Sequence, residues 1–497
     1  MLISVPLTTA PPLAPFPKKT RTSVPQLLYV ACHSRARTGR VQRFRACLPL
    51  AREMGGGVRA HEVKQHRGRR HQDACAADGD GGASPSLAEA YLYGDVLESV
   101  VARVPAADLA AAARVSREWL RAVRAALRRR PRRLPWLVVH LQCRSRRSAA
   151  AYDPNSGAWL TVPHAPPPHA TPSHVRLVRG ARGDRVCALS LSGLAVARDP
   201  LGAAACVDLA APAVWRVDPV FAAVGDRVVA LGGACRLALG EGEDAAAVEV
   251  HESGVGGGGG WTSCDPMPEP LRDSAAATWL SAAATERRVY LVDKATGWAS
   301  WFDPASRRWG PTRRLGMTDV AVSNWGVAPG RAYMDNERLV LFGAKRADKQ
   351  ESCSVVVTAW EVDGDTLEPV PSSSRGDAMP SELAERLFPR DDDEDEEEDE
   401  DDWEDGTSPS IGVCGNAAGG YVYNAAEPSN GAVLYELREG SNEATAGTVA
   451  RWEWVPCAPA VRAQPMGRAI LGCSPVGVDE LALGFGSAGP TACAAAH

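Results

Sequence analysis

The chain has 497 residues, of which 45% are hydrophobic and 23% charged, and its formal net charge is −5 at pH 7. Its length predicts two to three domains, and this ordinary composition excludes a fibrous chain. No run of about 18 apolar residues occurs, so a membrane-spanning helix and a membrane partner are not expected. Thirteen cysteines form no C-x-x-C pair, and Cys187, Cys235 and Cys473 lie in apolar runs. Reduced, mostly buried thiols of this kind are typical of a cytoplasmic or nuclear protein.

Residues 1–89 form a basic N-terminal segment without sustained hydrophobic periodicity, and its first acidic residue is Glu53. We expect this segment to be disordered. An acid-poor start with arginine, serine and threonine is also typical of an organelle transit peptide, which is the alternative to a cytoplasmic or nuclear location. A working start at Met54 instead of Met1 is also compatible with the sequence. The histidines of residues 61–71 alternate with arginines, whose charge opposes a metal site.

Residues 90–133 carry the pattern of a compact unit of three short helices. Apolar residues at the spacing of one helical stripe predict the first helix: Val96, Leu97, Val100, Val101 and Val104. Asp95 is a suitable N-cap for that helix, and Pro105, which lacks an N–H group, ends it. Asp108 and Ser116 can cap two further helices. A unit of this size buries too little surface to be an independent domain, so we expect it to complete its core against another surface.

The order of residues in this unit resembles the F-box. Eight positions match that motif: Leu92, Asp95, Val96, Leu97, Pro105, Leu109, Val115 and Trp119. Tyr93, Val104 and Ser116 depart from it, because Pro, Leu and Cys are usual at those positions. The resemblance implies that the eight matching residues bind a Skp-type adaptor and, through it, a cullin. An ordinary three-helix piece of a larger domain is the alternative.

Four arginines of the last predicted helix, Arg117, Arg121, Arg124 and Arg128, fall on one face, and the run RRRPRR follows them. A nucleic-acid patch is one interpretation of these charges. We favour a solvated face that suits the negative C-terminal end of the helix. No aromatic residues alternate with the arginines to stack bases, so a nucleic-acid partner is not expected.

Between residues 134 and 490 the pattern changes to short strands in a repeated order. A charged turn followed by an apolar run predicts a buried strand in five segments: 183–191, 225–233, 286–293, 336–343 and 478–486. Extended runs that end in tryptophan lie between them, and Trp159, Trp215, Trp261 and Trp309 are 56, 46 and 48 residues apart. Repeats near 50 residues, each of about four strands, are typical of a β-propeller. The repeats predict about six blades, with the strand at 478–486 closing the ring, and an open β-sandwich is the alternative.

The repeats are similar to kelch repeats. Gly232 and Gly233 form an intact Gly-Gly pair that is followed by Trp261, and an Asp-Pro turn at residues 303–304 precedes another tryptophan. An F-box followed by kelch repeats, over about residues 90–490, resembles the plant kelch-repeat F-box proteins. The expected fold class is α+β and multidomain, with a small three-helix F-box module before an all-β, kelch-type propeller.

This resemblance implies a substrate-recognition subunit of an SCF-type ubiquitin ligase, which recruits a target protein for ubiquitination and proteasomal degradation. Members of the family include receptors for phenylpropanoid and flavonoid enzymes such as phenylalanine ammonia-lyase and chalcone synthase, and others act on signalling or clock proteins. The alternatives are a propeller scaffold for protein–protein interaction without a ligase role, and a propeller enzyme.

Residues 371–410 are expected to be a disordered acidic insertion between the fifth and sixth blades, and residues 491–497 a short tail. The stretch 391–405 carries a charge of −14, so the rest of the chain carries +9. Its like charges repel, and it has no apolar face to offset the entropy of the chain. A partner that docks on Trp403, within this stretch, is an alternative to a solvated loop.

No pattern of catalytic residues stands out. Residues 484–489 match a dinucleotide fingerprint, but Pro490 and the chain end that follows leave no helix to hold a pyrophosphate. The histidines of the Pro-rich loop 164–174 cannot lie on one regular face, and no G-x-S-x-G elbow occurs. Glycines 256–260 lack the Lys-Ser or Lys-Thr pair of a phosphate-binding loop. We therefore expect no catalytic residue, no metal and no cofactor.

Substrate contacts are expected on loops at one end of the propeller, because loops differ between blades while strands repeat. Aromatic and charged loop positions are the candidates: Arg307, Arg308, Trp325 and Arg331. The sequence therefore predicts a protein substrate at these positions.

Overall fold

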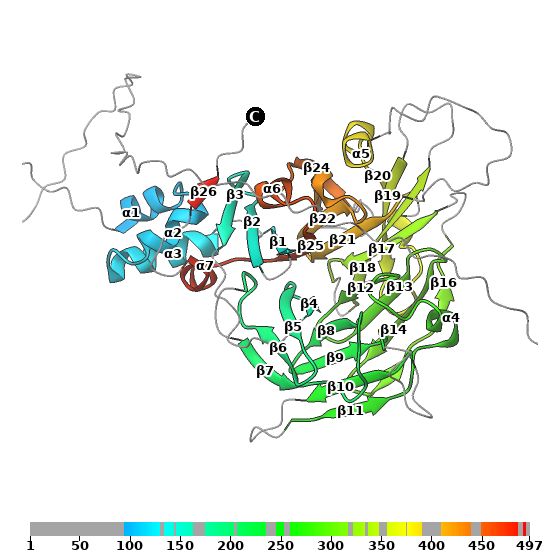
Figure 1. Ribbon diagram of the computed structural model, residues 1–497. Coiled ribbons are helices and arrows are strands. Elements are labelled where there is room, and N and C mark those ends of the chain that lie inside the picture. The colour runs from blue at the N-terminus through cyan, green and yellow to red at the C-terminus, as the bar shows by residue number, and fades with distance from the viewer. Residues whose placement is uncertain are drawn as a thin grey trace, which may run out of the picture. The chain divides into compact units, whose positions relative to one another are not determined.

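The structure is a computed structural model that describes most of the chain from Gly94 onward (Figure 1). The described ranges are 94–129, 134–143, 146–162, 174–202, 206–234, 245–252, 259–316, 322–332, 336–346, 355–373, 375–389, 409–438, 449–485 and 491–493. The basic segment 1–89 and the acidic stretch 391–405 lie outside these ranges, so their features stay predictions. Within the described ranges, no helix is long and apolar enough to span a membrane.

The described strands fall into antiparallel sets of four neighbours. The first set contains β25 (Arg468–Ser474), β1 (Trp136–Cys143), β2 (Arg146–Asp153) and β3 (Ala158–Val162). The second contains β4 (His174–Gly180), β5 (Arg185–Leu189), β6 (Gly193–Ala197) and β7 (Cys206–Ala210). The third contains β8 (Val220–Val224), β9 (Arg227–Leu231), β10 (Val248–Glu252) and β11 (Trp261–Cys264).

Three further sets follow in the chain. The fourth contains β12 (Leu280–Ala284), β13 (Val289–Asp293), β14 (Trp298–Asp303) and β15 (Arg308–Trp309), and β16 (Arg313–Arg314) also pairs with β14. The fifth contains β17 (Asn324–Pro329), β18 (Arg338–Arg346), β19 (Val355–Asp363) and β20 (Asp377–Ala378). The sixth contains β21 (Ile411–Asn416), β22 (Gly419–Asn424), β23 (Ala432–Leu437) and β24 (Val449–Val455).

The first strand of each set contacts the first strand of the next set, in the closed order β25, β4, β8, β12, β17, β21 and back to β25. Of these inner strands, β4 and β8 also pair in parallel, with Val178 opposite Phe221. A closed ring of inner strands removes the open sheet edges that a sandwich would leave. The mostly β structure with its curled sheets therefore fits a β-propeller.

The strand that closes the ring is not the one the sequence predicted. β25 comes from residues 468–474 and pairs with β1, with Leu471 opposite Val139. Residues 478–486 were expected to be that strand, and this expectation is wrong, because they form the helix α7 (Val478–Phe485). Glu480 accepts a hydrogen bond from the backbone N–H of Gly477 at 2.8 Å, as the acidic residue of a capping box does.

The other four predicted strands are present as β5, β9, β13 and β18. The tryptophans of the repeat join neighbouring blades. Trp159 on β3 donates its indole N–H to the carbonyl oxygen of Pro456, after β24, at 2.9 Å. Trp261 on β11 does the same with Ala210 at 2.8 Å, and Trp309 on β15 donates to the loop after β11 at 3.2 Å. An indole N–H that leaves water needs an acceptor, so each of these tryptophans fixes a blade to the one before it.

Three helices precede the first blade: α1 (Gly94–Val101), α2 (Ala106–Ala112) and α3 (Arg117–Arg129). Figure 1 shows them beside α7. Their buried side chains share one apolar cluster with the first blade, and its members include Leu97, Val101, Leu109, Val123, Trp136, Val138, Leu160 and Leu481. Burial of each such side chain stabilises the folded state by roughly 1.5–3 kcal/mol. Because the cluster is shared, the helical unit completes its core against the first blade and α7.

The first part of the segment 371–410, which was expected to be disordered, has regular structure. Residues 371–373 form a short 3-10 helix, and residues 375–389 contain β20 and the helix α5 (Ser381–Leu387). Leu387 and Phe388 are buried in the apolar cluster of the fifth and sixth blades. The predicted tail also starts as a strand, because β26 (Thr491–Cys493) pairs with β3. The described ranges also contain the short helices α4 (Glu269–Arg272) and α6 (Pro459–Ala463) and a 3-10 helix at Pro428–Asn430.

Candidate functional site

A cavity of about 230 Å³ opens where inner strands begin. The first or second residue of five inner strands lines it: Val175, Val220, Leu280, Ile411 and Arg468. We call this end the cavity end, and it includes the segments 190–192, 211–219, 265–279, 294–297, 425–431 and 456–467. The opposite end, where the inner strands finish, includes the segments 181–184, 225–226, 285–288, 304–307, 330–332 and 364–368.

Four cationic side chains line the cavity: Arg176, Arg179, Lys294 and Arg468. Arg179 Nη1 lies 2.7 Å from Asp184 Oδ2, and Arg176 Nε lies 3.5 Å from Asp218 Oδ1. Within the described ranges, neither Lys294 nor Arg468 has a carboxylate at ion-pair distance. The cavity therefore holds more positive than negative charge.

Asp218 fixes the rim of the cavity. Its Oδ2 accepts hydrogen bonds from the backbone N–H of Thr278 at 2.8 Å and from the Thr278 hydroxyl at 2.6 Å. Lys294 Nζ donates to the carbonyl oxygen of Thr278 at 2.8 Å. Hydrogen bonds to charged groups are stronger than neutral ones, so the turn that carries the neighbouring Trp279 is held in place.

The cations of the cavity lie close enough to affect one another. Burial lowers the pKa of Arg176, and the charge of Arg468 lowers it further. Burial also lowers the pKa of Lys294, and Arg179 acts in the same direction. A like charge nearby disfavours the charged form of a group. An anion in the cavity would relieve this repulsion.

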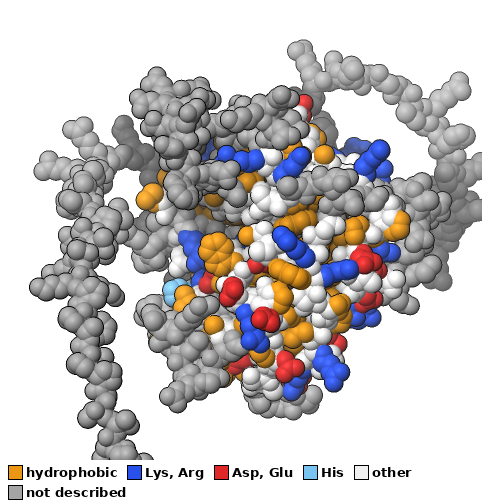
Figure 2. Space-filling model, turned by 90° about the vertical axis from the view of Figure 1, so that its right-hand side faces the viewer, with side chains coloured by type: hydrophobic (Ala, Val, Ile, Leu, Met, Phe, Trp, Pro, Cys, Tyr) orange, Lys and Arg blue, Asp and Glu red, His pale blue; other side chains and the backbone are white. Residues whose placement is uncertain are grey.

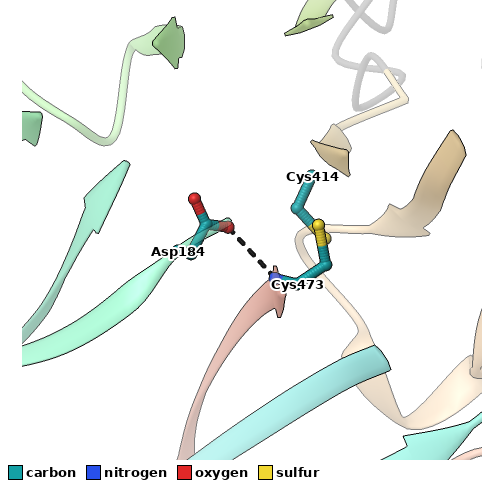
Figure 3. A group of neighbouring side chains, drawn as sticks. All are labelled: Asp184, Cys414 and Cys473. Carbon is teal, nitrogen blue, oxygen red and sulfur yellow. Dashed lines mark hydrogen bonds between the residues drawn. The ribbon is translucent and has the colours of Figure 1, made fainter. Parts of the chain in front are cut away.

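Asp184, Cys414 on β21 and Cys473 on β25 bring three potential metal ligands within 4.8 Å of one another (Figure 3). Asp184 Oδ2 is already engaged, because it accepts from the backbone N–H of Cys473 at 3.1 Å and pairs with Arg179. Burial raises the pKa of the Cys473 thiol well above its usual value, which disfavours the thiolate that a metal needs. The guanidinium of Arg179 would also repel a cation. This donor set does not fit a metal, and we interpret it as a contact between the first, second and sixth blades.

Large apolar side chains are exposed around the cavity end. Trp279, Val217 and Met466 have 61%, 44% and 94% of their surface exposed, and each lies within two residues of a cavity-lining residue. Leu191, in the turn between β5 and β6, is 80% exposed. Single exposed hydrophobic residues are ordinary, but several around one basic cavity form a candidate contact surface.

The predicted substrate residues do not lie at this end. Arg307 and Arg331 belong to the opposite end. Arg307 Nη2 lies 3.5 Å from a carboxylate oxygen of Glu252, and Arg331 Nη1 donates to a backbone carbonyl oxygen at 3.0 Å. Arg308 is exposed at the start of β15. Their role in substrate binding stays a prediction.

The prediction that Trp325 is a loop contact is wrong. Trp325 lies on the inner strand β17 and is 4% exposed. Its ring packs against that of Trp360, with ring centroids 6.0 Å apart. A side chain buried in the wall of the fifth blade cannot contact a substrate.

Six of the eight predicted adaptor residues divide into an exposed group and a buried group. Asp95, Val96, Pro105 and Val115 are exposed, with 60% of Val96 and 64% of Val115 accessible. Leu97 and Leu109 are 1% and 0% exposed, so their side chains hold the helices against the first blade and are not presented to a partner. Trp119 is half-buried against the same cluster, and Leu92 lies outside the described ranges.

The side of the molecule in Figure 2 shows lysine and arginine side chains interspersed with acidic ones. On α3, Arg124 Nη2 lies 3.8 Å from Asp479 of α7, so one of the four arginines predicted on that face is near an acidic partner. A nucleic-acid surface requires a basic field, and the side drawn in Figure 2 does not present one.

The chain was compared with known families and structures. No family profile matches it. It is 31% identical over 406 residues to an F-box/kelch-repeat protein of Arabidopsis thaliana, which covers 80% of this chain and 93% of that protein. A solved structure described as a 6-phosphogluconolactonase of Bacteroides uniformis is 12% identical, with a TM-score of 0.35 over 65% of this chain and 84% of that one. Dihydro-heme d1 dehydrogenase NirN is 12% identical, with a TM-score of 0.28 over 67% and 58%. These TM-scores are too low to carry an argument about fold or activity.

The propeller-like ring and the helical unit packed on its first blade define a propeller protein with a small helical module. The Arabidopsis relative identifies the class further. The chain belongs to the plant F-box/kelch-repeat protein family.

Sequence reasoning did not single out the four cations of the cavity. They lie on β4, in the turn after β13 and at the start of β25, so no local motif brings them together. The resemblance to the F-box and kelch families did locate the helical unit and the repeats that follow it in the chain.

Proposed function

We propose that this chain is the non-catalytic substrate-recognition subunit of an SCF-type ubiquitin ligase. The observation that carries the proposal is the helical unit, which exposes valines within a family whose name includes the F-box. Val96, Val100 and Val115 are 60%, 38% and 64% exposed. Exposed apolar side chains on a small helical surface are suited to bind a partner such as a Skp-type adaptor, which would bring a cullin.

The mechanism is proximity. The buried side chains of α1–α3 share a core with the first blade, so the helical unit and the propeller are packed together and not joined by a loose linker. A substrate on the propeller is then held at a defined distance from the adaptor. Such tethering raises the local concentration of the substrate near the ubiquitin carrier, and the catalysis belongs to the partners.

The adaptor surface is tested with Val96→Asp and Val115→Asp in the full chain. A charge at the centre of an apolar contact is expected to abolish co-purification of the Skp-type adaptor. Val207→Asp is the matched control, because Val207 is 42% exposed and belongs to the propeller strand β7 and not to the helical unit. Leu97 and Leu109 are unsuitable, since their replacement would disrupt the core. If the folded Val96→Asp and Val115→Asp proteins retain the adaptor as the control does, this surface is not the docking site, and a scaffold without a ligase role becomes the better reading.

The substrate class proposed from the family resemblance is a phenylpropanoid or flavonoid biosynthetic enzyme. The half-lives of phenylalanine ammonia-lyase and chalcone synthase are expected to rise when this protein is removed and to fall when it is overproduced. A proteasome inhibitor should block that fall. Unchanged half-lives in both directions would exclude this class of substrate and would leave the adaptor experiment unaffected.

A further inference from the structure

We propose that the substrate docks at the cavity end of the propeller, where acidic side chains of a protein segment enter the cavity and its apolar side chains pack on Trp279 and the neighbouring exposed residues. This inference rests on the proposed function and deepens it, because it names the surface and the chemistry of the partner.

The charge of the cavity favours an anion. Four cations face two carboxylates, and one of these, Asp184, is committed to Arg179 and to the backbone of Cys473. Asp218 is shared between Arg176 and Thr278. A pocket with excess positive charge and low-dielectric walls attracts an opposite charge more strongly than a flat surface does.

Donors remain available for a carboxylate. Arg176 is 7% exposed, and within the described ranges its Nε makes no hydrogen bond, although Asp218 Oδ1 lies 3.5 Å away. Lys294 Nζ uses one of its three N–H groups on Thr278, which leaves two. Arg468 is exposed at the mouth and has no ion-pair partner in the described part of the chain. An incoming carboxylate would accept hydrogen bonds that these cations do not make within the described ranges.

The size of the cavity limits what can enter it. A space of about 230 Å³ accommodates one or two side chains but not a helix or a folded element. The rest of the partner must therefore lie on the rim. Trp279, Val217 and Met466 project there, and tryptophan and methionine are enriched among the residues that contribute most to protein interfaces. Charge in the centre with apolar contacts around it therefore fits a protein segment better than a free small anion.

The rim is also held in a fixed conformation. Lys294 accepts at its carbonyl oxygen from the backbone N–H of Trp325 at 2.8 Å, and its own N–H donates to the carbonyl oxygen of Trp279 at 3.0 Å. The same two turns thus present a cation to the cavity and an indole to solvent. A preformed surface loses little entropy on binding, which favours affinity.

The experiment uses the full chain and a fluorescein-labelled peptide of alternating glutamate and leucine as the probe, with binding measured by fluorescence anisotropy. A peptide with glutamine in place of glutamate is the matched control for charge. We expect Arg468→Glu to weaken binding of the glutamate peptide on the order of tenfold or more, because it adds a like charge at the mouth. We expect Trp279→Ser to weaken it several-fold.

Two control variants match these changes. Arg185→Glu reverses an exposed arginine at the start of β5, beside the opposite end, and Val207→Ser removes an exposed apolar side chain on an outer strand. Both should bind the peptide as the unchanged protein does. Equal affinity of Arg468→Glu and the unchanged protein, or equal binding of the glutamate and glutamine peptides, would overturn the proposal. So would competition by inorganic phosphate together with no effect of Trp279→Ser, since that result would assign the cavity to a small anion.

Adaptor co-purification is measured on the same variants. Arg468→Glu and Trp279→Ser should retain the adaptor, while Val96→Asp should lose the adaptor and keep the peptide. A protein that binds the peptide and never binds the adaptor would refute the ligase role without touching the docking surface. A protein that binds the adaptor but not the peptide would refute the docking surface and leave the ligase role intact.

Discussion

Both ends of the propeller carry cationic side chains, but these differ in whether an acidic side chain lies beside them. At the opposite end, arginines lie beside acids: Arg227 Nε is 3.0 Å from Glu252 Oε1, and Arg182 Nε is 3.1 Å from Glu286 Oε1. At the cavity end, Lys294 and Arg468 have no such partner within the described ranges. These pairs of the opposite end are therefore locally neutral, whereas the cavity keeps an excess of positive charge that can attract a ligand.

Burial separates the two ends as well. Below the cavity end, Arg216 and Glu249 are 1% and 1% exposed, and their Nη2 and Oε2 atoms lie 2.8 Å apart. Glu249 also accepts from the backbone N–H of Ala213 at 2.8 Å, and Arg216 donates to two carbonyl oxygens. The Arg182–Glu286 and Arg227–Glu252 pairs of the opposite end are more exposed to water and to salt, which screen them. The buried Arg216–Glu249 pair therefore contributes more to stability than these two pairs do.

The largest expected effect is on Glu249. Glu249→Gln removes the carboxylate and leaves the Arg216 cation buried, so the free energy of unfolding should fall by about 3–5 kcal/mol. Urea unfolding followed by circular dichroism measures this change. Glu252→Gln at the opposite end is the matched control, and it should leave stability unchanged within error because its pair with Arg227 is solvent-exposed. Equal losses in the two variants would remove the distinction between the ends.

The next largest loss of stability is expected from substitutions at two turns that contain glycine. Gly225 at the opposite end and Gly233 at the cavity end both have a positive φ, of +60° and +66°. Alanine at Gly225 meets open space, so only the left-handed conformation costs about 1–2 kcal/mol. A Cβ on Gly233 would lie 2.2 Å from the backbone carbon of Asp218, the residue that fixes the rim. Gly233→Ala should therefore destabilise more than Gly225→Ala in the same urea experiment, and equal losses would show that the backbone at Asp218 yields easily.

Elements set by local interactions could be predicted from the sequence, and elements set by long-range contacts could not. The strands β5, β9, β13 and β18 were predictable, because a charged turn and an apolar run are local signals. Ring closure is not local, and the closing strand 468–474 was missed. The segment 478–485 satisfied the same local signal but became a helix, since Val478 and Leu481 lie three residues apart and are both buried against the helical unit.

The site was predictable only where a motif was present. The F-box resemblance located the helical unit, but it could not separate the exposed Val96 from the buried Leu97, which depends on the first blade. Trp325 was expected to be an aromatic loop residue, yet the strand pairing places it in the interior. The cavity cations come together only when the inner strands form a ring, so no single stretch of the sequence predicts this cluster.

The pH dependence of peptide binding tests whether Lys294 contributes charge to the cavity. Burial, and then the charge of Arg179, lower the pKa of Lys294, while Asp218 acts against this shift. Lysine is positive below its pKa, so affinity for the glutamate peptide should be lost as pH rises, and at a lower pH than an ordinary lysine would give. Lys294→Arg is the control, because arginine stays protonated throughout. The anisotropy titration of that variant should be flat over the same range, and an identical decline in both proteins would exclude Lys294 as the titrating group.

The smallest expected effect concerns the acidic stretch 391–405. This stretch joins the described chain shortly before Ile411, which lines the cavity, and it carries a charge of −14. Deleting it should leave the melting temperature nearly unchanged, because the cost of closing a loop depends only weakly on its length. The ordered residues 375–389, with Leu387 and Phe388 in the core, are kept in this variant. A deletion that removes residues 381–405 is the control and should destabilise strongly, since it also removes those two buried side chains. A large fall in melting temperature for the shorter deletion would mean that the acidic stretch has a structural role, such as pairing with the arginines of α3.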